Sequence, residues 1–288
     1  APKVVDQLAK EVVTGINSAA SVNPINLIAL SILSAPRQAM DEQQLIVQME
    51  SYRNLLAQTP YSKLTALPDG NGAEWLAYAE KLDAVSRSKH PLGDLIQTSD
   101  RQAVTLTYYR NNVLHLIALP SLLACLFVNN QRYSSEQVQA MVASFYPYLQ
   151  AELFLHWNSS ELSSEVQRWL DALVDCGYLH LNDKGYHATP ASSNEYALLE
   201  GLAANVMQTL ERYFLTLSVL SRKGSGELSA KELEEQCTLL AQRISLLYGI
   251  NAPEFFDKSL FRTLIQQLVS EKLLAKNSDD KLTFSNEL

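Results

Sequence analysis

The chain has 288 residues, of which 47% are hydrophobic and 19% are charged, and its formal net charge is −8 at pH 7. This composition is typical of a globular protein with a sizeable core and excludes a disordered chain. Lys and Arg number 23 against 31 Asp and Glu, and there is no basic run, so we do not expect nucleic-acid binding. The three cysteines are far apart and odd in number, which argues against a disulfide framework or a zinc site.

The first part of the chain is predicted to be mostly helical. Apolar residues at helical spacing predict helices over 4–19, 25–34, 41–56 and 74–85. Pro24 suits the first position of a helix, and Asp41 suits the position that caps one. Residues 93–107 are expected to form a β-hairpin whose turn lies at Ser99 and Asp100.

A long apolar segment follows, and we expect one central helix over 108–128. From Val113 to Val128 the only strongly polar side chains are those of His115 and Ser121. This length lies between that of a buried helix, roughly 10–14 residues, and that of a membrane span, roughly 20. Pro120 is expected to kink or split the helix, because proline removes a backbone donor. We therefore interpret the segment as a core helix, with shallow membrane contact as the alternative.

The polar residues at the head of this segment are the best local candidates for a site. On one continuous helix, Tyr108, Asn111, Asn112 and His115 share a face, and Arg110 points elsewhere. Such a face could hold a phosphate or the backbone of a partner. It could equally be a hydrogen-bond network that fixes the start of a buried helix, and we favour this structural interpretation.

The second half of the chain alternates long helices with short hairpins. Helices are predicted over 135–155 (interrupted near Pro147), 192–221 and 227–248. Residues 170–189 and 265–284 both show a helix, a short strand, a polar turn and a second strand, which is the order of a winged-helix-like unit. The hairpin expected at 93–107 would be a third, more degenerate instance. DNA binding is not expected, because the helix predicted over 161–176 carries four acidic residues against one arginine.

The predicted fold class is therefore mainly α, with a multi-helix body and small winged-helix-like β-hairpins as α+β appendages. We divide the chain into three regions. They are 1–130 with the first hairpin and the apolar helix, 131–191 with the second hairpin, and 192–288 with the long helices and the last hairpin.

Four segments resemble parts of the membrane-associated glycerol-3-phosphate acyltransferases of bacteria and mitochondria: the first fits the segment just after the family's catalytic domain, and the other three resemble signature blocks. The four segments are "GINSAASVNPINLIAL" (15–30), "TYYRNNVLHLIALPSLLA" (107–124), "FYPYLQAELFLHW" (145–157) and "AQRISLLYGINAPEFFDKSLF" (241–261). The most distinctive part of the last block contains Asn251, Pro253, Glu254, Phe255, Phe256 and Asp257. Their order and spacing resemble the C-terminal region of the bacterial long form.

The resemblance implies a reaction but no catalytic residue in this chain. Family members transfer a fatty acyl group to the 1-hydroxyl of glycerol 3-phosphate, using a catalytic His and Asp in a His-x4-Asp motif. His90 and Asp94 are one residue too close for that motif, and His156 and Glu161 have the spacing but the wrong acid. The chain begins in a helical pattern without an initiator methionine. We expect it to be a fragment that is inactive alone, its catalytic motif preceding Ala1.

The resemblance also sets the expected partners. They are the protein's own N-terminal acyltransferase domain and, through it, acyl-CoA or acyl carrier protein and glycerol 3-phosphate. Contact with membrane lipid at the cytoplasmic face of the bacterial inner membrane is a further expectation, and neither a cofactor nor a metal is expected. The alternative is a helical protein-interaction or membrane-docking module without an enzymatic role.

Overall fold

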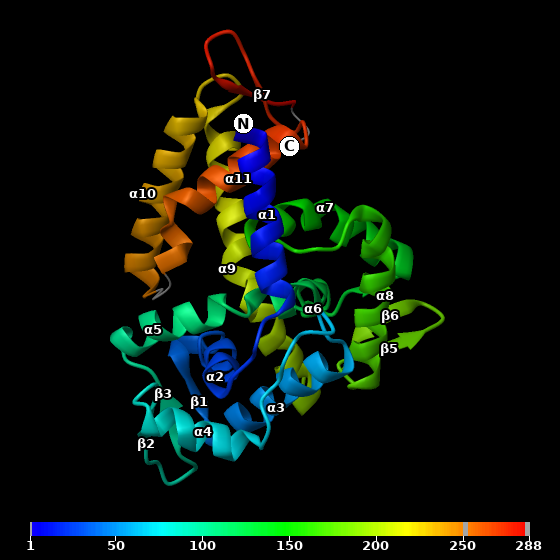
Figure 1. Cartoon of the computed structure of the whole chain (residues 1–288), viewed down its shortest axis with the longest axis vertical. Helices are drawn as coiled ribbons and strands as arrows, with labels where there is room; N and C mark the ends of the chain where they lie inside the picture. Colours follow the sequence, from blue (N-terminus) through cyan, green and yellow to red (C-terminus); the bar gives the residue numbers. More distant parts are fainter. Residues whose placement is uncertain (1, 250–252, 286–288) are drawn as a thin grey trace. The chain divides into compact units, whose positions relative to one another are not determined.

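The computed structural model describes residues 2–249 and 253–285, and it is mainly helical with small antiparallel sheets, which confirms the predicted fold class (Figure 1). The α-helices are α1 (Pro2–Ser18), α2 (Pro24–Ile32), α3 (Glu42–Gln58), α4 (Gly72–Lys81), α5 (Asp100–Asn111), α6 (Leu114–Phe127), α7 (Ser135–Leu153), α8 (Ser159–Asp175), α9 (Asn194–Lys223), α10 (Ala230–Tyr248) and α11 (Lys258–Ser270). Two short 3₁₀ helices are η1 (Pro36–Gln38) and η2 (Pro253–Phe256). The strands are β1 (Ala39–Asp41), β2 (Ser86–Ser88), β3 (Leu95–Gln97), β4 (Arg132–Tyr133), β5 (Leu179–Asn182), β6 (Gly185–Ala188), β7 (Ala275–Lys276) and β8 (Leu282–Thr283).

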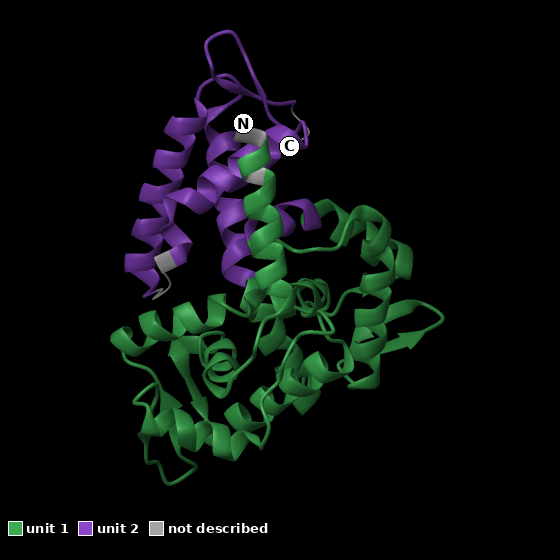
Figure 2. Ribbon diagram, in the orientation of Figure 1, with its two compact units in different colours: residues 1–145, 153–206 green, residues 146–152, 207–288 purple. Residues whose placement is uncertain are grey.

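The chain forms two compact units (Figure 2). Unit 1 contains residues 1–145 and 153–206, and unit 2 contains residues 146–152 and 207–288. Helices α7 and α9 contribute residues to both units. The three regions predicted from the sequence were defined by motifs, whereas the two units are defined by contacts in the structure. The three-region division therefore stays a prediction.

One order of elements, a strand, two helices and a hairpin, occurs three times. It appears as β1-α3-α4-β2-β3, as β4-α7-α8-β5-β6, and as an isolated bridge at Ser229 followed by α10-α11-β7-β8. The last strand is central each time, because the sheet orders are β1-β3-β2 and β4-β6-β5, and Ser229 pairs with Lys281 next to β8. The two winged-helix-like hairpins predicted near 179–188 and 275–283 are confirmed. A third repeat is also present.

The first helix of each repeat starts in the same way. Asp41, Ser134 and Ser229 cap α3, α7 and α10 by accepting backbone N–H groups of the first turn. The fourth and eighth residues after the cap are apolar and at most 1% exposed. They are Leu45 and Met49, Val138 and Val142, and Leu233 and Cys237. The same spacing therefore turns the same face of each helix to its core.

The second helix of each repeat ends in a left-handed residue. These residues are Asp83 (φ 55°), Gly177 (φ 76°) and Lys272 (φ 61°). In each case the N–H of the next residue donates to a carbonyl five residues earlier, at 2.9–3.0 Å, which is the hydrogen bond of a Schellman motif. Two residues after the left-handed position, the side chain is buried again, at Val85, Leu179 and Leu274.

The hairpin expected at 93–107 is wrong. Only Leu95–Gln97 of that range is a strand, and it pairs with β1 and with β2. Asp100–Asn111 is α5, because the side chain of Ser99 accepts the N–H of Gln102 and the side chain of Gln102 accepts the N–H of Ser99. The β-branched residues of this segment favour a strand by composition, but this capping box and burial at helical spacing outweigh that preference.

The single helix expected over 108–128 is also wrong. Helices α5 and α6 are separate and meet at a bend of 92°, where Val113 donates to the carbonyl of Arg110. Helix α6 is not split at Pro120, and α7 likewise continues through Pro147. Residues 114–124 are buried throughout, so tertiary packing compensates for the backbone donor that Pro120 lacks.

Within the part of the chain that the structure describes, no single helix has both the length and the hydropathy of a membrane span. Only α5 and α6, taken together as a bent pair, reach those values.

Candidate functional site

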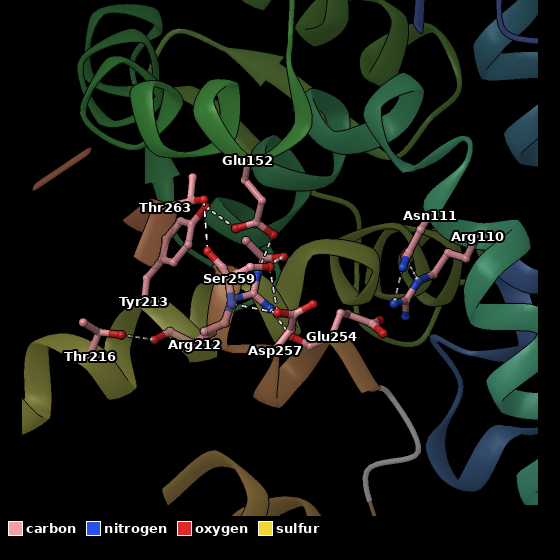
Figure 3. A network of polar contacts seen from close by, with 11 residues as sticks. Arg110, Asn111, Glu152, Arg212, Tyr213, Thr216, Glu254, Asp257, Ser259 and Thr263 are labelled. Atoms are coloured by element: carbon pink, nitrogen blue, oxygen red, sulfur yellow. Dashed lines mark hydrogen bonds and ion pairs between the residues drawn. The ribbon is translucent and has the colours of Figure 1, made fainter. Parts of the chain in front are cut away.

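The polar residues at the head of the apolar segment do not form the shared face that one helix would give them. Tyr108 is 67% exposed, and Asn111 and Asn112 are exposed as well, whereas Arg110 and His115 are buried. The bend between α5 and α6 separates them, because His115 lies beyond it. Arg110 donates from Nε and Nη2 to Oδ1 of Asn111 at 3.3 and 3.2 Å (Figure 3).

His115 instead contacts the end of α1. Its Nε2 lies 3.0 Å from the carbonyl oxygen of Asn17, and Nδ2 of Asn17 donates to the carbonyl oxygen of Leu153 at 2.8 Å. Since a carbonyl only accepts, Nε2 carries the hydrogen. Nδ2 of Asn26 also donates to the carbonyl oxygen of Tyr109 at 2.8 Å. The backbone carbonyl of Asn17 and the side chain of Asn26, both in segment 15–30, therefore contact the helices on the two sides of the bend.

An aromatic cluster adjoins His115 within unit 1. The Tyr61 ring lies edge-on to His115 (5.1 Å between centroids), His156 (4.4 Å) and Trp157 (4.9 Å). Burial lowers the pKa of His115 to about 4 and lowers the pKa of His156 as well. Burial also raises the pKa of Tyr61 to about 12. All three rings are therefore neutral near pH 7, and a histidine with so low a pKa is a weak general base.

In the first of the two His–acid spacings noted in the sequence, the carboxylate of Asp94 contacts Arg87 and the backbone of His90. The guanidinium of Arg87 contacts Glu42 at 2.8 Å, Glu80 at 2.7 Å and Asp94 at 3.0 Å, and it holds the pKa of Asp94 below its usual range. Nδ1 of His90 accepts the N–H of Leu92 at 3.2 Å.

In the second spacing, His156 and Glu161 each contact other groups. His156 packs against Tyr61 and Trp157, whereas the carboxylate of Glu161 accepts the N–H of Asn158 in the cap of α8 at 2.9 Å. Helix capping therefore accounts for Glu161.

A buried ion pair in unit 2 was not foreseen from the sequence. Arg212 of α9 is 1% exposed and pairs with the carboxylate of Glu152 in the last turn of α7 (Figure 3). The hydroxyl of Tyr213 donates to Glu152 at 3.0 Å, and Nη1 of Arg212 donates to the carbonyl oxygen of Glu254 in η2 at 3.3 Å. The pair therefore joins three elements of the unit. In the sequence, this ion pair is visible only as one acidic and one basic residue within apolar helices. That pattern is too common to show which residues pair.

The last family-like block has structural roles where it is described. Asn251 lies outside the described residues. Within η2, Glu254 supplies the backbone carbonyl to Arg212, and Phe255 is 2% exposed in the core of unit 2. Asp257 caps α11 by accepting the N–H of Ser259 at 2.7 Å. Across 2–249 and 253–285, no three His, Cys, Asp or Glu side chains are placed to hold a metal ion.

Comparison with known proteins gives one consistent family. Residues 1–277 match the family model described as "Glycerol-3-phosphate acyltransferase C-terminal region". Relatives named glycerol-3-phosphate acyltransferase include those of Pseudomonas paraeruginosa (44% identical over 283 residues), Pseudomonas fluorescens (43% over 283) and Ectopseudomonas mendocina (42% over 278). These matches cover 96–98% of this chain but only 34% of each relative. The chain thus spans about a third of the length of the curated relatives it matches.

Proposed function

Because the chain belongs to the family of the glycerol-3-phosphate acyltransferase C-terminal region, we propose that it is the non-catalytic C-terminal part of such an enzyme. Its role is to support the acyltransferase domain that precedes it in the longer protein. The observation that carries this proposal is the coverage of 98% of this chain but 34% of the relative.

The longer protein would act as a glycerol-3-phosphate 1-O-acyltransferase in phospholipid synthesis. The 1-hydroxyl of glycerol 3-phosphate attacks the thioester carbonyl of acyl-CoA or acyl-acyl carrier protein. A carbon–oxygen bond forms, the carbon–sulfur bond breaks, and the thiol leaves with the proton. We place the general base in the preceding domain, because the resemblance assigns it to the His-x4-Asp motif and because burial lowers the pKa of His115 and of His156, which makes both weak bases.

The donor thioester and glycerol 3-phosphate would therefore reach the protein through that domain. We place the protein at the cytoplasmic face of the inner membrane. Flotation of the chain with liposomes of zwitterionic or anionic lipid tests direct contact of this region with lipid. Flotation without acyl transfer in the longer protein would instead favour the membrane-docking module.

Complementation tests the supporting role. The preceding domain is expressed alone, or together with residues 1–288 as a separate chain, and acyl transfer to glycerol 3-phosphate is measured. We expect little activity from either part alone and partial recovery from the mixture. A chain carrying Glu152→Gln, which disturbs the buried pair of unit 2, should restore less activity than one carrying Asp280→Asn in an exposed pair. Full activity of the preceding domain alone would contradict the proposal.

A further inference from the structure

Helix α1 carries an exposed apolar stripe. Its members are Val4, Val5, Leu8, Val12 and Ile16, which are between 53% and 71% exposed. Four of them recur every fourth residue, and Val5 adjoins them, so they lie along one side of the helix. Scattered exposed apolar side chains are normal, but a continuous stripe of this kind indicates a surface that another element covers.

Within unit 1, the hydrogen bonds that hold α1 lie at its C-terminal end. Asn17 donates to Leu153 and accepts from His115, whereas the stripe covers the preceding turns. The sequence of α1 contains four valines and Gly15, all of which lower helix propensity. A 17-residue helix of this composition is marginal by itself, so a surface packed along the stripe would stabilise it.

We propose that this stripe, Val4, Val5, Leu8, Val12 and Ile16, is the surface on which the preceding part of the longer protein docks. The inference rests on the proposed function, because it assigns the stripe to the acyltransferase domain. About two thirds of each relative lies outside the matched part, and the match is to a C-terminal region, so the preceding chain joins this region through α1. A covalently linked domain is present at high effective concentration, and a stripe of five side chains therefore suffices to hold it.

Two other occupants fit less well. A helix that lies on a membrane surface is usually rich in Lys and Arg and often carries Trp or Phe, whereas α1 has two lysines, two acidic residues and no aromatic residue. A second copy of the chain would need an interface of about 800 Å² per partner for stable association, which is more than five such side chains supply.

Photo-crosslinking in the full-length protein tests the docking. Benzoylphenylalanine is placed at Leu8 or Val12, with Gln7 on the polar side of α1 as the matched control, and crosslinked peptides are identified by mass spectrometry. We expect positions 8 and 12 to crosslink to peptides that precede Ala1, at several times the yield from position 7. Crosslinks to residues 1–288, to a second copy or to lipid, or equal yields from all three positions, would overturn the proposal.

Paired lysine substitutions give a second readout. In the full-length protein, Leu8→Lys should increase the rate at which a protease cleaves between the preceding domain and residues 1–288, because it weakens the docking. Gln7→Lys should leave that rate unchanged. Neither substitution should change the helix content of the full-length protein, measured by circular dichroism, because both side chains are exposed. Acyl transfer by the unmodified full-length protein is measured alongside. Its absence defeats the proposed function, whereas failure of the crosslinks in an active enzyme defeats only the docking surface.

Discussion

The imidazole Nε2 of His115 lies 3.0 Å from the backbone carbonyl oxygen of Asn17. This contact joins the first turn of α6 to the last turn of α1, and it uses residues from two of the four family-like blocks. The ring is buried and burial lowers its pKa to about 4, so we expect its role to be structural, joining two distant segments of the chain.

Replacing His115 tests that role. His115→Ala removes the donor to Asn17 and leaves a gap beside Tyr61, so we expect the free energy of unfolding to fall by about 3 kcal/mol. His115→Gln keeps an N–H donor of similar reach and should lose clearly less. Urea unfolding followed by tryptophan fluorescence measures both, since Trp157 belongs to the same aromatic cluster. Equal losses would show that the hydrogen bond to Asn17 contributes nothing.

His115 should also make stability depend on pH. Its folded-state pKa of about 4 lies below the ordinary value of 6.5, so the unfolded chain binds the proton first as the pH falls. The contribution of His115 to the free energy of unfolding is therefore fully present above pH 6.5 and is lost as the pH falls from 6.5 to 4. It amounts to about 3 kcal/mol in total. His156 acts in the same direction, because burial also lowers its pKa.

The His115→Gln variant isolates this contribution. The difference in unfolding free energy between the unsubstituted chain and the variant should shrink as the pH is lowered from 7 to 4.5. A difference that stays constant over that range would contradict a buried, neutral His115.

The pair of Arg212 and Glu152 makes a separate prediction for unit 2. Glu152→Leu or Arg212→Met leaves one buried charge without its counterpart, and we expect each to cost about 3–5 kcal/mol. The double variant Arg212→Met with Glu152→Leu should cost less than the sum of the single changes, because no charge is left buried. Lys276→Met, at an exposed pair in the same unit, is the control and should change stability little. Additive losses in the double variant would argue against direct coupling.

Two of the left-handed positions, Lys272 and Gly177, predict that glycine favours stability and that alanine does not. Lys272 has a positive φ of 61°, so Lys272→Gly should relieve strain and stabilise the chain by about 1 kcal/mol, whereas Lys272→Ala should not. Gly177→Ala introduces the same strain and should destabilise by a similar amount. Thermal unfolding of the three variants checks the pattern, and stabilisation by Lys272→Ala would contradict it.

Local signals made much of this fold predictable. Asp41 caps α3 as expected, and the hairpin near 179–188 follows from a polar turn between two short strands. Strand β2 was missed because its residues, Ser86–Ser88, have no strand pattern and become a strand only by pairing with β3. The bend between α5 and α6 is set by tertiary packing around Asn17 and Asn26, which sequence spacing does not reveal.

The candidate site was less predictable than the fold. The predicted face of Tyr108, Asn111, Asn112 and His115 required one continuous helix, and the chain bends between α5 and α6 instead. Arg212 and Glu152 are 60 residues apart, and nothing local indicates that they pair. Such pairs depend on how the chain folds back on itself rather than on any motif.

Acyl transfer by the purified chain alone tests the central claim most directly. Residues 1–288 are incubated with labelled acyl-CoA, or with acyl-acyl carrier protein, and glycerol 3-phosphate, and the acylated product is quantified. The account predicts no product above a protein-free blank. Saturable formation of 1-acylglycerol 3-phosphate in proportion to the amount of chain would contradict it.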